Sequence, residues 1–246
     1  MKDILQDIVA HTHSLGFLSL VKVSNDNSTA IDSMAEDRSV ILSAETHTPV
    51  AEFKGTFGMP NLDKLALHLK NPEYQKDAKI DVIEAERNGE TIPTHIHFEN
   101  ATGDFQNDYR FMNQQIIEEK LKSVKFKGAN WDVTFNPSMA SIGRMKLQSA
   151  AHAEEPTFNV KTVVTGDATD LVFSFGDAST HAGEFVFQPN ISGKLTHTWA
   201  WPVAQTQAIL SLGGDITMSI SDQGAMQIAV DSGLATYNYI LPAQSK

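Results

Sequence analysis

The sequence contains no cysteine among its 246 residues. That absence excludes a disulfide framework, a thiolate nucleophile and any zinc site built on cysteine. No apolar stretch approaches the roughly 20 residues that are needed to cross a bilayer. The first residues, Met1 to Leu5, carry an acidic residue and a helical period where a signal peptide has an uninterrupted apolar stretch. We therefore expect a cytoplasmic protein with no membrane partner.

An excess of basic residues is also missing, because the formal net charge is −11. A simple nucleic-acid binder usually carries a basic excess that neutralises phosphates and releases counterions. The chain as a whole should repel DNA, so any role on DNA would depend on a local basic face or on topology. Acidity that only promotes solubility is the other interpretation of this charge.

Recognisable catalytic signatures are absent too. The sequence has no GxSxG elbow, no phosphate-binding GxxxxGK[ST] loop and no GxGxxG after a strand, and its carboxylates form no acid–base pair. His95 and His97 place two imidazoles on one face of a predicted strand, a geometry that a metal can use, but no motif supplies a third ligand. We expect a protein that is not an enzyme and that uses neither metal nor cofactor.

What the sequence does contain is one pattern that occurs twice. Amphipathic segments with apolar residues at a helical period each precede a group of alternating strands. The predicted helices cover 3–15, 62–69, 138–151 and 203–212. The predicted strands cover 17–23, 29–34, 38–44, 50–56, 80–86, 94–98, 108–112, 131–135, 158–164, 171–175, 184–188, 195–201, 215–220, 226–230 and 236–241.

This repetition predicts an α+β fold of two similar domains, each with two helices on an antiparallel sheet. The period is too long for a solenoid repeat, so the pattern indicates a duplicated domain. The segment 113–128 mixes apolar and charged residues and is the best linker candidate. The predicted organisation is therefore an N-terminal domain over 1–112, a connector over 113–128 and a C-terminal domain over 129–246.

Several basic residues lie on or beside the predicted helices. If the helices face one way, these cations gather on one surface that can contact phosphates despite the negative net charge. The alternative is that they are simply the polar sides of amphipathic helices, and the fourth helix has no basic residue. The residues concerned are Lys2, Lys64, Lys70, Arg144 and Lys146.

Three stretches of the chain resemble the sliding clamps of DNA polymerases, both the T-even phage type and proliferating cell nuclear antigen (PCNA). Residues 18–42 are similar to the opening helix-strand-strand unit, and residues 57–69 to the step from a strand into a Leu-x-x-Leu helix. The closing strand over 224–243, with its Tyr-Asn-Tyr-Ile-Leu-Pro-Ala end, is similar to the Leu-Ala-Pro-like end of such clamps. In order and spacing, the resemblance extends over nearly the whole chain.

The resemblance implies a homotrimeric ring with pseudo-six-fold symmetry, whose helices line a hole around double-stranded DNA. Such a processivity factor tethers the replicative polymerase and is placed on DNA by a clamp-loader ATPase; if the gene belongs to a phage, it acts in the host cytoplasm. The resemblance then places the five basic residues beside the phosphates, without sequence readout.

The resemblance also implies two protein-binding regions. A hydrophobic pocket for partner peptides would contain Met34, Val40, Ile116, Ile117, Leu241 and Pro242. Edge strands would pair across subunits, which hides otherwise adhesive edges. The paired strands would contain Asp108, Tyr109, Arg110, Phe111 and Met112 of one chain and Glu184, Phe185, Val186, Phe187 and Gln188 of its neighbour.

Two other functions remain open at this stage. One is a trimeric β-rich structural or interaction protein of a virion with no role on DNA. The other is a β-rich domain that binds or hydrolyses a small molecule. The two helices in each half favour the clamp over the virion protein, and the missing nucleophile and acid–base motifs count against the hydrolase.

Overall fold

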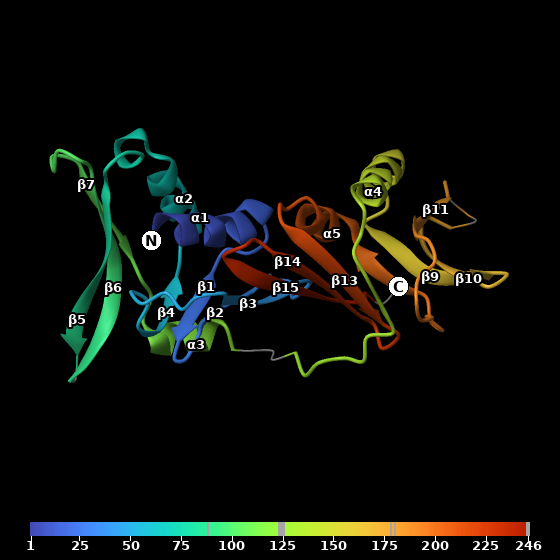
Figure 1. The fold of residues 1–246 in the computed structure, drawn as a ribbon, viewed down its shortest axis with the longest axis horizontal. Coiled ribbons are helices and arrows are strands. Elements are labelled where there is room, and N and C mark those ends of the chain that lie inside the picture. The colour runs from blue at the N-terminus through green and yellow to red at the C-terminus, as the bar shows by residue number, and fades with distance from the viewer. Residues whose placement is uncertain (88, 123–125, 178, 180, 245–246) are drawn as a thin grey trace. The chain divides into compact units, whose positions relative to one another are not determined.

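The computed structural model describes residues 1–87, 89–122, 126–177, 179 and 181–244 (Figure 1). The chain forms two compact units. Unit 1 contains Met1–Lys125 together with Ser232–Tyr237, and unit 2 contains Phe126–Asp231 together with Asn238–Lys246. No helix in the described part of the chain is both long enough and apolar enough to span a bilayer.

Unit 1 consists of a helix, four strands, a second helix and three strands, in that order. Its helices are α1 (Lys2–His11), α2 (Leu62–Lys70) and α3 (Gln114–Lys120), with 3-10 turns at His13–Leu15 and Pro72–Tyr74. Its strands are β1 (Val21–Asn25), β2 (Thr29–Met34), β3 (Ile41–Thr46), β4 (Gly55–Met59), β5 (Lys79–Arg87), β6 (Glu90–Glu99) and β7 (Gln106–Arg110).

Unit 2 repeats this order after one additional strand, β8 (Val133–Phe135). Its helices are α4 (Met139–Ala151) and α5 (Val203–Leu210). Its other strands are β9 (Thr157–Thr165), β10 (Ala168–Phe175), β11 (Gly183–Gln188), β12 (Trp199–Pro202), β13 (Asp215–Ser221), β14 (Ala225–Asp231) and β15 (Ala235–Pro242), of which the first three residues of β15 belong to unit 1. The predicted α+β class with antiparallel sheets is therefore confirmed.

Several predicted boundaries were wrong. The helix predicted over 3–15 ends at His11, because the buried Thr12 hydroxyl donates to the Ile8 carbonyl and the Thr12 backbone leaves the helical region. The strand predicted over 50–56 begins only at Gly55, since the Phe53 amide bonds back to the Val50 carbonyl in a turn. The helix predicted to reach residue 212 ends at Leu210.

Each unit buries alternate residues of its strands against its helices. In unit 1 the order β4-β1-β2-β3 is antiparallel, and β5-β6-β7 forms a second sheet. In unit 2 the strands β11-β10-β9-β12 form one sheet in that order, and β14, β13 and β8 are hydrogen-bonded neighbours in a second sheet. β2 shows the pattern clearly, because Ile31 and Ser33 are buried while their neighbours are half-exposed. The described residues form five α-helices, three in unit 1 and two in unit 2, so the prediction of two helices per domain omitted α3.

Helix α1 is fixed in unit 1 by the segment Ser232–Tyr237. The Asp7 carboxylate accepts hydrogen bonds from the Ser232 hydroxyl at 2.9 Å and from the Tyr237 hydroxyl at 2.8 Å. The His11 ring stacks on the Tyr237 ring with centroids 4.0 Å apart. Burial alone would raise the pKa of Asp7, but the bonds from His11, Tyr237 and Ser232 outweigh it and lower that pKa. A segment near the end of the chain therefore holds the first helix in place.

Candidate functional site

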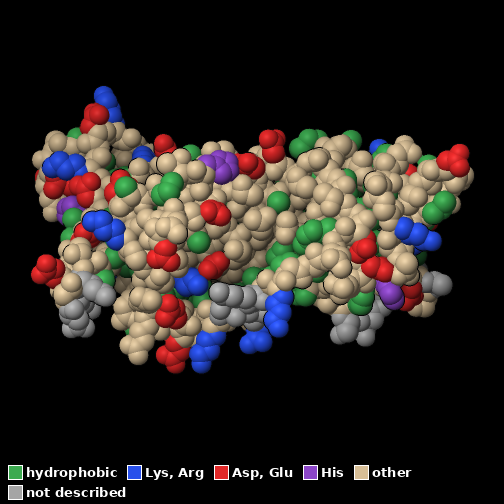
Figure 2. All heavy atoms as spheres, turned by 60° about the horizontal axis from the view of Figure 1, so that its bottom comes forward, with side chains coloured by type: hydrophobic (Ala, Val, Ile, Leu, Met, Phe, Trp, Pro, Cys, Tyr) green, Lys and Arg blue, Asp and Glu red, His purple; other side chains and the backbone are tan. Residues whose placement is uncertain are grey.

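The predicted DNA-facing cations occupy different environments. Lys64 and Lys70 on α2 and Lys146 on α4 are exposed. Lys2 is half-buried and donates to the Tyr74 carbonyl at 3.0 Å, and Arg144 donates to the Val186 carbonyl of β11 at 3.3 Å. Figure 2 shows one face of the molecule, on which acidic and basic side chains are interspersed. Lys64, Lys70 and Lys146 therefore have the freest ammonium groups of the set for a ligand from solution.

On α2, the charge of Lys64 acts on the imidazole of His68. Burial lowers the pKa of His68, and the positive charge of Lys64 one turn earlier lowers it further. The His68 ring lies near the Phe98 ring, with centroids 5.1 Å apart. His68 is therefore a reporter of the charge environment around Lys64.

Strand β7, one of the two strands predicted to form the joint by pairing across subunits, is an edge strand. It pairs with β6 on one side, and no described strand pairs with its other side. The Phe111 amide bonds to the Thr94 carbonyl, and the Asn100 amide to the Phe105 carbonyl. Because antiparallel pairs alternate, Tyr109 directs its backbone groups toward β6, whereas Asp108 and Arg110 direct theirs outward. Among the described residues, no strand pairs with the outward backbone groups of Asp108 and Arg110, whereas the next outward residue, Met112, bonds to β4.

The structure places the two last residues of this predicted joint outside the strand. β7 ends at Arg110. The Phe111 ring packs on Phe57 with centroids 4.3 Å apart, and Met112 exchanges two backbone hydrogen bonds of 2.8 Å with Gly58 of β4. Phe111 and Met112 thus hold the end of β7 against β4 within unit 1.

Strand β11 is the edge of its own sheet as well. It pairs with β10, and the part of the chain that the structure describes supplies no strand for its other side. Phe187 is fully buried and stacks on Phe173 with centroids 4.1 Å apart, while Glu184 is exposed and bonds Lys161 at 2.8 Å. Phe185, Val186 and Gln188 are half-buried. Both predicted joint strands thus lie at sheet edges.

One of the six predicted pocket residues lines a cavity. Met34, at the end of β2, is half-buried in a cavity of about 860 Å³ in unit 1. Arg38, Leu121 and Met112 also line it. The pattern of the sequence did not single out Arg38 or Leu121 as pocket residues; Leu121 directly follows α3, within the predicted connector.

The other five pocket residues do not line that cavity. Val40 and Ile117 in unit 1 and Leu241 in unit 2 are fully buried. The Ile116 side chain is 43% exposed, and Pro242 is exposed. A partner peptide can reach Ile116 and Pro242 from solution, whereas the three buried side chains contribute to the cores.

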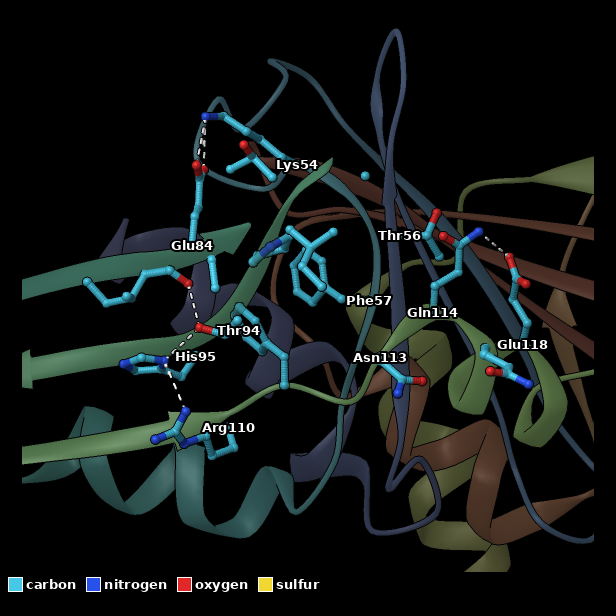
Figure 3. A pocket seen from close by; sticks show the side chains of 18 residues that line it. Lys54, Thr56, Phe57, Glu84, Thr94, His95, Arg110, Asn113, Gln114 and Glu118 are labelled. Carbon is cyan, nitrogen blue, oxygen red and sulfur yellow. Dashed lines mark hydrogen bonds and ion pairs between the residues drawn. The ribbon is translucent and has the colours of Figure 1, made fainter. Parts of the chain in front are cut away.

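A larger cavity, of about 1130 Å³, lies elsewhere in unit 1 (Figure 3). It is bounded by β4, the β5–β6 hairpin, the end of β7 and the start of α3. Lys54 and Glu84 form an ion pair of 2.9 Å at its rim, and Gln114 donates to Glu118 at 3.0 Å. The apolar side chains of Phe57, Ile83, Ile92, Pro93 and Phe111 line it. The lining also includes the polar side chains of Thr94, His95 and Arg110, so the groove presents a mixed surface of apolar and polar groups.

The two histidines of β6 lie beside this groove and interact with β7. His97 Nδ1 is 2.8 Å from Asp108 Oδ1, and His95 Nε2 is 3.6 Å from the same oxygen. Burial lowers the pKa of His95, and the attraction of Asp108 does not outweigh it. Among the described residues, no group of three or more His, Cys, Asp or Glu side chains is placed to hold a metal ion.

Comparisons with known proteins identify the fold. No family model matches the chain, and no curated protein matches it. PCNA from Thermococcus kodakaraensis is similar with a TM-score of 0.67 and 11% identity, over 99% of this chain and 97% of that chain. PCNA from A. fulgidus, solved with the C-terminal region of FEN-1 bound, is similar with a TM-score of 0.66 and 11% identity, over 100% and 95%.

A third solved structure is PCNA from Entamoeba histolytica. Its TM-score is 0.65 at 12% identity, over 99% of this chain and 94% of that chain. The chain therefore has a PCNA-like clamp fold along its whole length. The resemblance to clamps that the sequence indicated is confirmed at the level of the fold.

Proposed function

We propose that this chain is a sliding clamp, a non-enzymatic processivity factor that encircles double-stranded DNA and tethers a DNA polymerase. The observation that carries the proposal is the match of the fold to PCNA over 99% of this chain and 97% of that chain. A ring needs subunits of one size and shape, so a likeness over the full length counts for more than a shared motif. The T-even phage type that the sequence resembles, with action in the host cytoplasm, is part of the proposal.

The proposed ring is a homotrimer with six similar domains. Its joints form between the outward edge of β7 on one subunit and β11 on the next, and the position of both strands at the edges of their sheets supports this arrangement. Closure explains how an acidic chain stays on DNA, because a linked ring need only remain closed. Within the ring the exposed Lys64, Lys70 and Lys146 contact phosphates, which give no sequence readout. Lys2 and Arg144 are the other two predicted DNA-facing residues. In the single chain they donate hydrogen bonds to backbone carbonyls.

The proposed partners are the replicative polymerase and a clamp-loader ATPase. The PCNA of A. fulgidus was solved with a C-terminal region of another protein bound. By analogy, a terminal peptide of a partner binds this chain near Met34, where the cavity that Arg38 and Leu121 line offers apolar surface beside a cation. The exposed Ile116 and Pro242 and the buried Val40, Ile117 and Leu241 complete the peptide-binding set that the sequence resemblance implies.

A test of topological linkage addresses the proposal directly. The protein is loaded on nicked circular DNA at a concentration that favours trimers, its subunits are cross-linked, and the DNA is washed at high salt. High salt screens phosphate contacts, so only a linked ring remains. We expect the cross-linked protein to stay on the circle and to be released when a restriction enzyme linearises it. Cross-linked trimers that wash off the intact circle would contradict the clamp function.

A further inference from the structure

The duplication of the chain leaves one sheet edge covered in unit 2 and open in unit 1. In unit 2, β13 pairs with β14 on one side and with β8 on the other. The register places Met218 opposite Phe135 and Ile220 opposite Val133. Met218 and Ile220 are 0% exposed. The strand β8 thus completes the burial of β13.

The strand in the same place in unit 1 is β5. Both β5 and β13 follow the second helix of the repeated order and begin a three-strand antiparallel sequence. β5 pairs with β6, and no strand in the described ranges pairs with its other edge. Ile80 and Val82 are only half-buried, and Ile83 is 38% exposed. The burial that β8 gives to β13 is therefore missing from β5.

The direction of the backbone groups shows that this edge can accept a strand. Thr94 in β6 and Asn100 directly after it, both even-numbered, bond toward the β7 side, so the odd-numbered residues of β6 bond toward β5. Their partners in β5 include Asp81 and Ile83, which therefore bond inward. Val82, which lies between these two residues, and Ile80, which precedes Asp81, therefore direct their backbone N–H and C=O groups outward.

The open edge is regular and acidic. The register of β5 on β6 is continuous from Lys79 to Ile83, and the irregularity begins only after Ile83. The acids on and beside this edge are Asp81, Glu86 and Glu84, of which Glu84 is paired with Lys54 at 2.9 Å. The basic residues of the strand are Lys79, whose ammonium is bound to Glu99 at 2.6 Å, and Arg87. Pairing with β5 of a second copy would bring these acids together, and opposed like charges destabilise a sheet.

We propose that the outward edge of β5 binds an extended, basic segment of a partner protein as an added antiparallel strand. The covered edge in unit 2 supplies the pattern: in β8 the buried Val133 and the half-buried Phe135 flank the exposed Thr134. A fitting segment alternates in the same way, with apolar side chains beside Ile80 and Val82 and basic side chains beside the acids. Main-chain hydrogen bonds give affinity in such an addition, and alternate side chains give specificity.

A peptide derived from β8 tests the proposal without the natural partner. The probe is a labelled peptide of residues 129–137 carrying Asp132→Lys, and its binding to the full chain is followed by fluorescence anisotropy. Val82→Pro removes one outward N–H and leaves the inward bonds of β5 to β6 intact. We expect saturable binding to the unchanged chain and about tenfold weaker binding to Val82→Pro. Val82→Thr, which keeps the N–H, is the matched control and should bind as the unchanged chain does.

A second variant protects the test against misfolding of the proline variant. Asp81→Lys with Glu86→Lys changes only exposed side chains, and it should weaken the same basic peptide and strengthen an acidic version of it. Binding that is equal in the Val82→Pro and unchanged chains would overturn the proposal, since the peptide would then pair elsewhere, for example with β13. No saturable binding to the unchanged chain would overturn it as well. Neither outcome depends on ring formation.

Discussion

At the scale of single residues, His68 links the structure of α2 to its proposed role. Its pKa is lowered first by burial and then by the charge of Lys64. A DNA phosphate near Lys64 would offset that charge and stabilise the protonated imidazole. The pKa of His68 is thus sensitive both to the loss of Lys64 and to the arrival of an anion.

We expect Lys64→Gln to raise the pKa of His68, because one positive neighbour is removed while burial remains. An NMR titration of the imidazole resonances measures the change. Lys70→Gln is the matched control, since Lys70 is not among the causes of the shift. Duplex DNA should raise the pKa of His68 in the unchanged chain, and a pKa that does not move with saturating DNA would count against contact through this face of α2.

At the scale of elements, α3 shows how a short helix is positioned by a residue without a side chain. Gly58 of β4 lies directly under α3, and a Cβ added to Gly58 would lie 2.9 Å from two side-chain carbons of Ile117. Ile117 is fully buried, and Asn113 caps the helix by accepting from the Ile116 amide at 2.9 Å. The close approach of β4 and α3 therefore depends on glycine.

Gly58→Ala should destabilise the chain by about 1–3 kcal/mol, because the new methyl group overpacks the interface with Ile117. Urea unfolding measures the free energy, and limited proteolysis measures the exposure of α3. Adding Ile117→Ala removes the two closest carbons and should restore part of the loss that Gly58→Ala causes. Additive effects of the two substitutions would show that the contact between Gly58 and Ile117 is not the cause.

The elements also show what the sequence could and could not predict. Helical periods located four of the five helices among the described residues, α1, α2, α4 and α5. The sequence did not show that Asp222 accepts bonds from the Thr196 and His197 amides at 2.8 and 2.9 Å. It also did not show that Met34 lines a cavity while Val40 is fully buried, because both are apolar residues near strand ends. Local patterns report local structure, whereas contacts between distant segments depend on packing.

At the scale of the whole molecule, the assembly into a ring remains a prediction. Three chains of 27.0 kDa give a trimer of about 81 kDa. The proposed joint depends on the outward backbone groups of β7, of which Arg110 supplies one N–H. The side chain of Arg110 is 70% exposed, so its replacement leaves the core unchanged.

Arg110→Pro should convert the trimer into smaller species at micromolar concentration, because it removes an outward donor while the inward bonds of Tyr109 remain. Light scattering over a concentration series measures the mass. Arg110→Ala keeps the N–H and should remain near the mass of the unchanged chain. An unchanged chain that stays at 27.0 kDa at every concentration would remove the basis of the ring.

The anchoring of α1 by Ser232–Tyr237 has a consequence for biosynthesis. Helix α1 is translated before the serine and tyrosine hydroxyls that bind Asp7, which follow that residue by 225 and 230 positions, and before the ring that stacks on His11. A growing polypeptide on the ribosome therefore holds α1 without its final partners until residues 232–237 have emerged. Unit 1 is thus completed only after most of unit 2 has been synthesised.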